Sequence, residues 1–203
     1  MRMAKAEEKE ADWFATLDEE LEKKTLQITD NQVEQNTQKI EINRNLLQDL
    51  FRIWIRFNKI NVHYTMSPEP SNFAHFVVYP EQWDLKQDFN FSGVENVALT
   101  DRTQGRVGDS LKAWFYSVDS QTNFRLTFEY CEGEHYYKYA GWKRIFSNYV
   151  LMDIPITKFD EKKYHEILAD VIKIWYESHL RRDREIVLKH LREKYEKGET
   201  FTQ

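Results

Sequence analysis

The densest group of polar residues that could bind a ligand lies in one stretch of the sequence, residues 101–109 (DRTQGRVGD). Gly105 and Gly108 permit tight turns there, so the stretch is expected to form a loop. Arg102 and Arg106 could each hold a phosphate or a carboxylate through paired hydrogen bonds. The simpler alternative is a connecting loop whose charged side chains pair with one another.

A second candidate is the turn expected at Cys131–Glu134, which Tyr130 precedes and His135 follows. A phenol, a thiol, two carboxylates and an imidazole therefore occur within six residues. The Cys, Glu and His side chains could bind a metal ion, and Tyr130 and His135 a ligand, but an exposed polar turn is the simpler interpretation. No His-x-x-x-His or His-Glu-x-x-His pair occurs, and a single cysteine excludes a multi-cysteine knuckle, so we expect no metal site. The sequence also contains no phosphate-binding glycine loop and no nucleophile elbow.

A β-sheet is expected to position these groups, because the middle of the chain alternates apolar and polar residues. Within residues 123–130, for example, Phe124, Leu126 and Phe128 share one face with Tyr130. The segments with strand character are 73–80, 94–100, 111–118, 123–130, 135–142 and 145–154. They predict an antiparallel meander of about five strands, with one face in the core and one in water.

A long C-terminal helix is expected to cover the apolar face of this sheet. Helical spacing of apolar residues extends from residue 158 to about residue 197. Residues 178–185 are polar all round, so the helix either breaks there or extends into solvent. Arg181, Arg182 and Arg184 alternate with acidic residues, which is typical of a solvated helix face. The predicted fold class is therefore α+β.

The N-terminal part of the chain predicts one long helix, because residues 4–24 are rich in Ala, Glu and Lys and residues 26–60 contain no Gly or Pro. From Leu46 onward this helix is apolar almost all round, so its last turns should enter the core of a head domain. We expect a helical segment at 1–25, a coiled-coil stalk at 26–49 and an α+β head at 50–203. In heptads, the a positions are Leu26, Val33, Ile40, Leu47 and Trp54.

Two d positions of this seam hold asparagine, Asn36 and Asn43, where Leu or Ile is usual. An asparagine buried in the seam of a lone helix costs about 1–3 kcal/mol, whereas symmetric copies can surround a shared water or anion. The segment V33-E-Q-N-T, followed by I40-E-I-N, resembles the Val-x-x-Asn-Thr motif in the stalks of trimeric autotransporter adhesins. In that family the d-position asparagines bind a halide on the trimer axis. The resemblance implies a parallel trimer in which Asn36 and Asn43 face an axial chloride or water.

The resemblance is confined to residues 26–57 and gives no information about the head. Arg44 follows Asn43 where the motif has Thr, which is a departure in the second layer. The sequence also shows neither a signal peptide nor a membrane span, so the adhesin role does not transfer. An alternative is intramolecular, with the same helix packed along the C-terminal helix of its own chain.

Composition favours a cytoplasmic protein that does not bind nucleic acid, because the net charge is −5 and the pI is near 5.7. Aromatic residues make up 15% of the chain and are concentrated in the predicted strands, where Tyr136, Tyr137 and Trp142 are examples. They either fill a core or an interface, or line a pocket between the sheet and the C-terminal helix.

We predict a non-enzymatic, homo-oligomeric scaffold or interaction module that needs no cofactor besides the axial chloride, has no membrane partner, and offers its head to a protein partner. The alternative is a small-molecule-binding protein or enzyme that uses the aromatic pocket.

Overall fold

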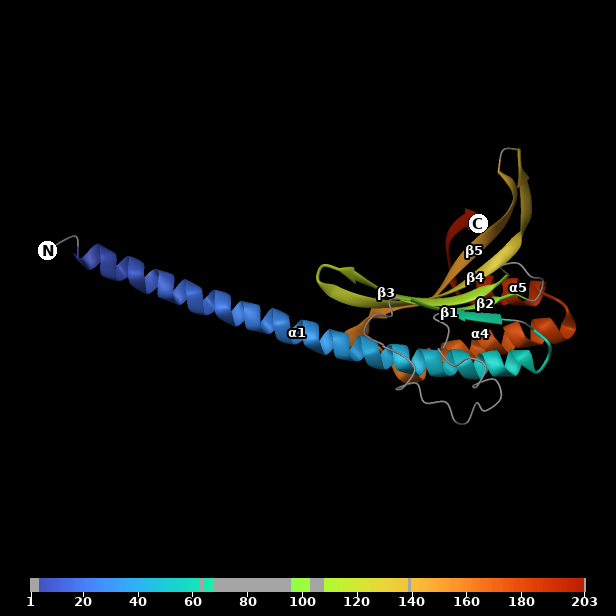
Figure 1. Ribbon diagram of the computed structural model, residues 1–203, viewed down its shortest axis with the longest axis horizontal. Coiled ribbons are helices and arrows are strands. Elements are labelled where there is room, and N and C mark those ends of the chain that lie inside the picture. Colours follow the sequence, from blue (N-terminus) through green and yellow to red (C-terminus); the bar gives the residue numbers. More distant parts are fainter. Residues whose placement is uncertain (1–3, 63, 68–95, 103–107, 139, 203) are drawn as a thin grey trace. The chain divides into compact units, whose positions relative to one another are not determined.

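The computed structural model describes residues 4–62, 64–67, 96–102, 108–138 and 140–202. They divide into two compact units, residues 1–38 and residues 39–203, and each unit is described by itself. The elements, shown in Figure 1, are the helix α1 (Ala4–Asn58), the strands β1 (Tyr64–Ser67), β2 (Asn96–Asp101), β3 (Ser110–Val118), β4 (Gln121–Tyr137) and β5 (Gly141–Pro155), the short 3-10 helix η3 (Ile156–Lys158), the helices α4 (Glu161–Arg181) and α5 (Glu185–Lys194), and the strand β6 (Glu196–Thr202).

The six strands form one sheet in the order β1-β2-β3-β4-β5-β6, and all neighbouring strands are antiparallel. This meander confirms the predicted α+β fold, with one strand more than expected. The segments at 94–100, 111–118, 123–130 and 145–154 lie within or overlap β2, β3, β4 and β5. The predicted strand at 73–80 lies outside the described residues.

The turn predicted at Cys131–Glu134 is wrong, and so is the separate strand predicted at 135–142. β4 continues through these residues to Tyr137, and its pairing with β5 shifts between Cys131 and Gly133. A β-bulge of this kind inserts one extra residue without reversing the chain. Gly133 supports it with a φ of 153°, and the chain reverses instead between Tyr137 and Gly141.

The C-terminal helix breaks within the polar stretch at 178–185, which is one of the two alternatives that the sequence left open, and two helices and a strand occupy that part of the chain. Asp160 caps the start of α4 by accepting a hydrogen bond from the Lys163 amide at 3.2 Å. α4 ends where Arg182 adopts a left-handed conformation with φ of 55°, and the Asp183 amide donates to the Ser178 carbonyl at 3.0 Å. α5 and β6 follow this break.

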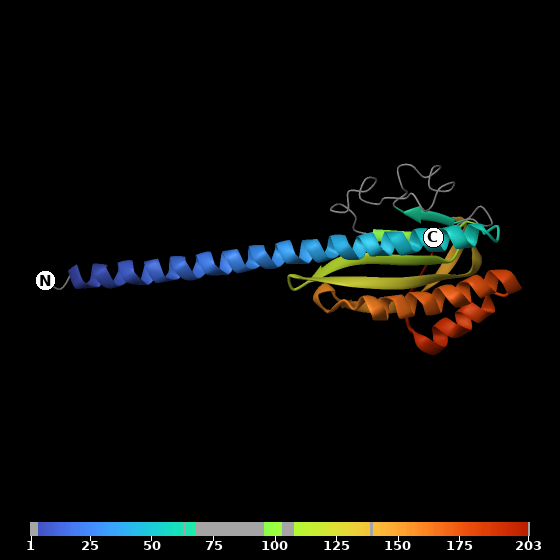
Figure 2. The same ribbon diagram turned by 90° about the horizontal axis from the view of Figure 1, so that it is seen from below.

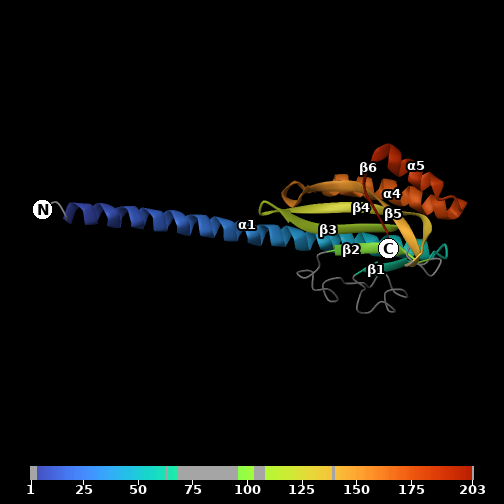
Figure 3. The same cartoon turned by 90° about the horizontal axis from the view of Figure 1, so that it is seen from above.

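The core of the larger unit lies between one face of the sheet and two helices, the part of α1 from residue 39 onward and α4. These two helical stretches run side by side in Figures 2 and 3. Phe57 contacts Trp175 with ring centroids 5.2 Å apart, and Asp49 Oδ2 lies 3.0 Å from His165 Nε2. The last turns of α1 therefore enter the core as predicted, and they pack beside a C-terminal helix of their own chain. The larger unit begins at residue 39, whereas the sequence suggested a head that begins at residue 50.

The smaller unit contains the N-terminal part of α1. Its side chains at residues 18–34 are all exposed, and these include four apolar residues that are more than half exposed: Leu21, Leu26, Ile28 and Val33. In the part of the chain that the structure describes, no helix has both the length and the apolar character needed to cross a membrane.

Candidate functional site

A cleft of about 1060 Å³ opens in the larger unit at the N-terminal end of β3. The turn after α1 and the end of β2 form one side of its lining, and the β4 bulge and the junction between α4 and α5 also contribute. Most of the lining side chains are polar or charged. They include Asp101, Asp109, Arg144, His179, Arg182 and Arg184.

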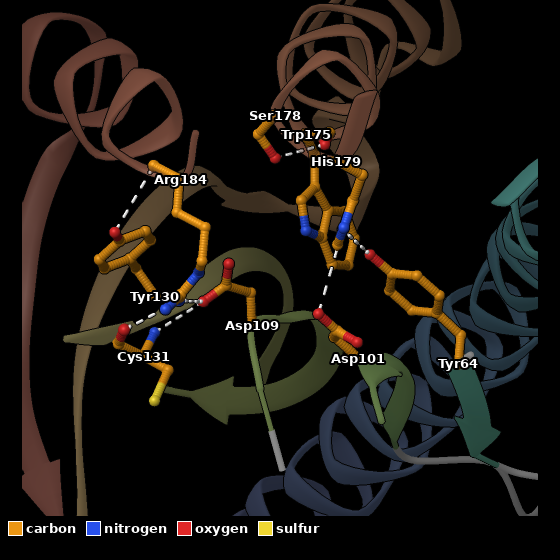
Figure 4. A network of polar contacts seen from close by, with 9 residues as sticks. All are labelled: Tyr64, Asp101, Asp109, Tyr130, Cys131, Trp175, Ser178, His179 and Arg184. Atoms are coloured by element: carbon orange, nitrogen blue, oxygen red, sulfur yellow. Dashed lines mark hydrogen bonds and ion pairs between the residues drawn. The ribbon is translucent and has the colours of Figure 1, made fainter. Parts of the chain in front are cut away.

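The first polar cluster in the cleft is centred on Asp109, whose side chain is only 3% exposed (Figure 4). Asp109 Oδ1 accepts a hydrogen bond from the Cys131 amide at 2.8 Å and forms an ion pair with Arg184 Nη2. The same guanidinium nitrogen donates to the Cys131 carbonyl at 2.9 Å. Since β3 pairs with β4 only as far as Glu129, Asp109 and Arg184 together satisfy the next backbone groups of β4.

In this cluster, burial and the ion pair between Asp109 and Arg184 shift the pKa of each group in opposite directions. Burial raises the pKa of the Asp109 carboxyl, although the Arg184 charge and the Cys131 amide act in the opposite direction. For Arg184, burial would lower the pKa of the guanidinium, but the charge and hydrogen bond of Asp109 outweigh it, so that pKa is raised. Tyr130 lies under the guanidinium, with its ring centroid 4.8 Å from Arg184 Cζ, and burial raises the pKa of its phenol to about 12.

The second polar cluster joins α4 to the edge of the sheet (Figure 4). His179 Nε2 lies 2.8 Å from the Tyr64 hydroxyl and 4.0 Å from Asp101 Oδ2. Burial lowers the pKa of the His179 imidazole, against the pull of the Asp101 charge. Burial, helped by the charges of Asp101 and Asp109, raises the pKa of the Tyr64 phenol well above its usual value. At neutral pH the imidazole that His179 contributes to the cleft is therefore neutral, and it is hydrogen-bonded to the neutral phenol of Tyr64.

This arrangement suits the binding of a small polar molecule. Carboxylates from Asp101 and Asp109 lie in the same cleft as guanidinium groups from Arg144, Arg182 and Arg184, so it offers partners to both ends of a dipolar ligand. Two of these arginines are already engaged, because Arg184 pairs with Asp109 and Arg144 Nε donates to Glu134 at 2.9 Å. Among the described residues, no three His, Cys, Asp or Glu side chains are grouped so that they could hold a metal ion.

The residues proposed from sequence for the head are not brought together in this cleft. Arg102 is exposed and donates to Thr65 Oγ1 at 3.4 Å, and Arg106 lies outside the described residues. Tyr130 is buried beside Arg184 and does not line the cleft. His135 is exposed on the distal part of β4, where its ring contacts Tyr137 at 5.0 Å.

The two stalk asparagines differ in their surroundings. Asn36 is exposed, whereas Asn43 has 0% exposure and is covered by residues of its own chain. Of the aromatic residues named above, Tyr136 and Trp142 are 56% and 66% exposed and do not line the cleft.

Sequence reasoning missed the residues that give the cleft its chemistry. The loop at 101–109 was singled out, and both of its end residues, Asp101 and Asp109, do line the cleft. The alternating charges at 181–185 predict a solvated helix face for Arg184, but α4 ends before this residue and its side chain pairs with Asp109. His179 has no neighbour in sequence that marks it, since its partners come from β1 and from the end of β2.

Comparison of the chain with protein-family models, with curated proteins and with solved structures found no match.

Proposed function

We propose that the protein is a homo-oligomeric interaction module, in which the exposed part of α1 associates with the same part of other copies and the head presents contact surfaces. The supporting observation is the exposure of the heptad seam. Leu26 and Val33 occupy successive a positions and are 59% and 60% exposed. Apolar side chains seven residues apart lose this contact with water when parallel helices pack on them.

The trimeric arrangement that the stalk motif implies places Asn36 at the axis. Its side chain is exposed in the single chain, so copies of the amide can surround a water or a chloride ion. Asn43 is not included in this proposal, because its side chain is enclosed within the head of its own chain. The shared seam is therefore short, and we expect an association that weakens on dilution.

The test is a double substitution in the seam, Leu26→Glu with Val33→Glu, followed by analytical ultracentrifugation. We expect the variant to sediment as a monomer at concentrations at which the unaltered chain is a trimer, because the carboxylates would be buried next to one another. The circular dichroism of the head should be unchanged.

A matched control is available on another face of the same helix. Leu21 and Ile28 are also seven residues apart and are 51% and 58% exposed, but Ile28 is two positions after Leu26 and points about 200° away from it. Leu21→Glu with Ile28→Glu should leave the trimer intact. If only this control pair dissociated the oligomer, the assignment of the seam to Leu26 and Val33 would be wrong.

A second candidate function, the binding of a small dipolar molecule, is favoured by the polar cleft. Backbone amide resonances at Asn61, Gly108 and Gly133 report on its lining. We expect a set of amino acids and small phosphorylated compounds to include one that shifts these resonances selectively, and His179→Gln to weaken its binding. Shifts spread over the surface, with none at the three amides, would contradict this second function.

A further inference from the structure

The hairpin formed by the ends of β4 and β5 extends beyond the other strands of the sheet (Figure 1). We call residues 134–138 and 140–144 the ribbon. On one side, β3 pairs with β4 only as far as Glu129, and on the other, β6 pairs with β5 only from Ile145. Among the described residues, the strands of the ribbon therefore pair only with each other. The bulge at Gly133 lies at its base, where such irregularities bend a strand.

The ribbon carries exposed aromatic side chains on both of its faces. Tyr136 pairs across the strands with Trp142, and their rings are 5.5 Å apart with 56% and 66% of the side chains exposed. Successive side chains alternate in direction, so Tyr137, which is 37% exposed, lies on the opposite face together with His135. Each of these aromatic rings has an apolar body and a polar group at its edge.

These aromatic residues have no core to fill, although a two-stranded ribbon gains little stability by itself. Exposed aromatic clusters of this kind commonly mark a surface that binds a partner. The charge of the ribbon restricts the partner. It contains Lys138, Lys143 and Arg144 against a single carboxylate, Glu134, so its formal charge is +2 on a chain whose net charge is −5.

We propose that the ribbon binds the surface of a membrane that contains anionic lipid, with Trp142, Tyr136 and Tyr137 at the level of the headgroups. Trp and Tyr are favoured at that depth because the ring is partly buried while its polar edge stays hydrated. The lysines would be attracted to the negative surface potential of the same headgroups. The inference concerns peripheral contact, and it departs from the expectation of no membrane partner, which the sequence supported only by its lack of a long apolar segment. It rests on the proposed function, since it identifies a contact surface of the head.

The distribution of the aromatic rings favours a lipid surface over a protein or a nucleic acid. A flat protein surface, or a row of stacked bases, would cover only one face of the ribbon and leave either Trp142 or Tyr137 in water. The headgroup layer of a bilayer can surround both faces of an inserted hairpin. Its anionic lipids also complement the local positive charge.

The experiment is co-sedimentation of the full chain with vesicles of phosphatidylcholine, prepared with and without phosphatidylserine. We expect binding to the vesicles that contain phosphatidylserine, with weaker binding as the salt concentration rises. Trp142→Ala should weaken the partition coefficient about tenfold, and Lys143→Gln about fivefold. Leu180→Ala is the matched control, because Leu180 is 59% exposed but lies on α4, and it should bind as the unaltered chain does.

Two results would overturn the inference: no binding to either vesicle, or binding that Trp142→Ala and Lys143→Gln leave unchanged although both variants melt as the unaltered chain does. The first result would direct the search to an acidic protein cleft that encloses the ribbon. The stalk variant Leu26→Glu with Val33→Glu separates this inference from self-association. If the chain proves to be a monomer, we still expect vesicle binding and its loss in Trp142→Ala. If the chain is an oligomer that does not bind vesicles, the ribbon proposal is refuted and the proposed function is not.

Discussion

Asp109 is the residue on which the local structure of the cleft depends most. A carboxylate that is 3% exposed is costly unless its oxygens are paired, and here it meets both a backbone amide and a guanidinium. These contacts close the open end of the β3–β4 ladder and hold Arg184 at the rim of the cleft. The same ion pair therefore has a structural role and fixes a charge where a ligand would approach.

Replacing Asp109 by alanine should lower the free energy of unfolding by about 2–3 kcal/mol, because the Cys131 amide and Arg184 lose their acceptor. Urea denaturation measures this loss. Asp153→Ala is the comparison, since Asp153 pairs with Arg125 at the surface with 29% exposure and its loss should cost about 1 kcal/mol or less. Equal losses in the two variants would mean that Asp109 has no special structural role.

His179 should make stability depend on pH in a defined direction. Its folded pKa lies below the usual 6.5, mainly because of burial, so the unfolded chain takes up the proton first as the pH falls. The contribution of neutral His179 is therefore complete above about pH 6.5 and is lost as the pH falls toward the lowered folded pKa. Tyr64, Asp101 and Arg184 are the groups that act on the imidazole.

The measurement is urea denaturation of the unaltered chain and of His179→Gln between neutral pH and about pH 5. We expect the unaltered chain to lose more stability over this range than the variant does. Parallel curves for the two proteins would show that His179 has the same pKa in the folded and unfolded states.

The limits of sequence reasoning at this scale are visible in the two clusters of the cleft. The Gly and Asp residues of the loop at 101–109 predict a tight connection. The two end residues of this loop, Asp101 and Asp109, both line the cleft. The pairing of Tyr64 with His179 spans 115 residues and depends on how β1 is placed at the edge of the sheet. Local spacing contains no information about such a contact.

At the scale of elements, the bulge at Gly133 determines where the ribbon begins. Its φ of 153° lies in a region that residues with a side chain rarely adopt, yet the space around its Cα is open. Gly133→Ala should therefore cost about 1–2 kcal/mol from backbone strain alone. Thermal unfolding tests this against Gly198→Ala, whose nearest neighbour would be 3.5 Å from the new Cβ and whose φ is not in that region, and which should be close to neutral.

The bulge also explains why the sequence suggested a turn at Cys131–Glu134. Glycine among polar residues is a cue for both structures, because each needs a residue with an unusual φ. What decides between them is whether the following residues find a partner strand. Gly141, with φ of 73°, allows the chain to reverse further on, so β5 returns alongside β4 from Tyr137 to Asn123.

The two parts of α1 illustrate a similar ambiguity. The same a and d spacing extends from Leu26 to Phe57, and the sequence correctly predicts one helix with apolar last turns. The spacing of apolar residues shows which face of a helix is apolar, but it does not show which part of the protein covers that face. In the structure Leu47 and Trp54 are buried in the head, whereas Leu26 and Val33 are exposed, so only the first part is available to another copy.

At the scale of the whole molecule, Asn36 should limit the stability of the oligomer and define its register. Asn36→Leu is expected to raise the midpoint of thermal dissociation, equivalent to about 1 kcal/mol per chain, because a leucine is preferred at d. Asn31→Leu is the control at an exposed position outside the seam and should not change the midpoint. An unchanged midpoint for both variants would place Asn36 outside the interface.

Self-association through the exposed part of α1 is tested most directly by the mass of the full chain in solution. Sedimentation equilibrium should be measured over a roughly hundredfold range of protein concentration. We predict a mass that approaches three times the 24.6 kDa of one chain at the upper end and falls on dilution. A mass that stays at 24.6 kDa over the whole range would contradict the account.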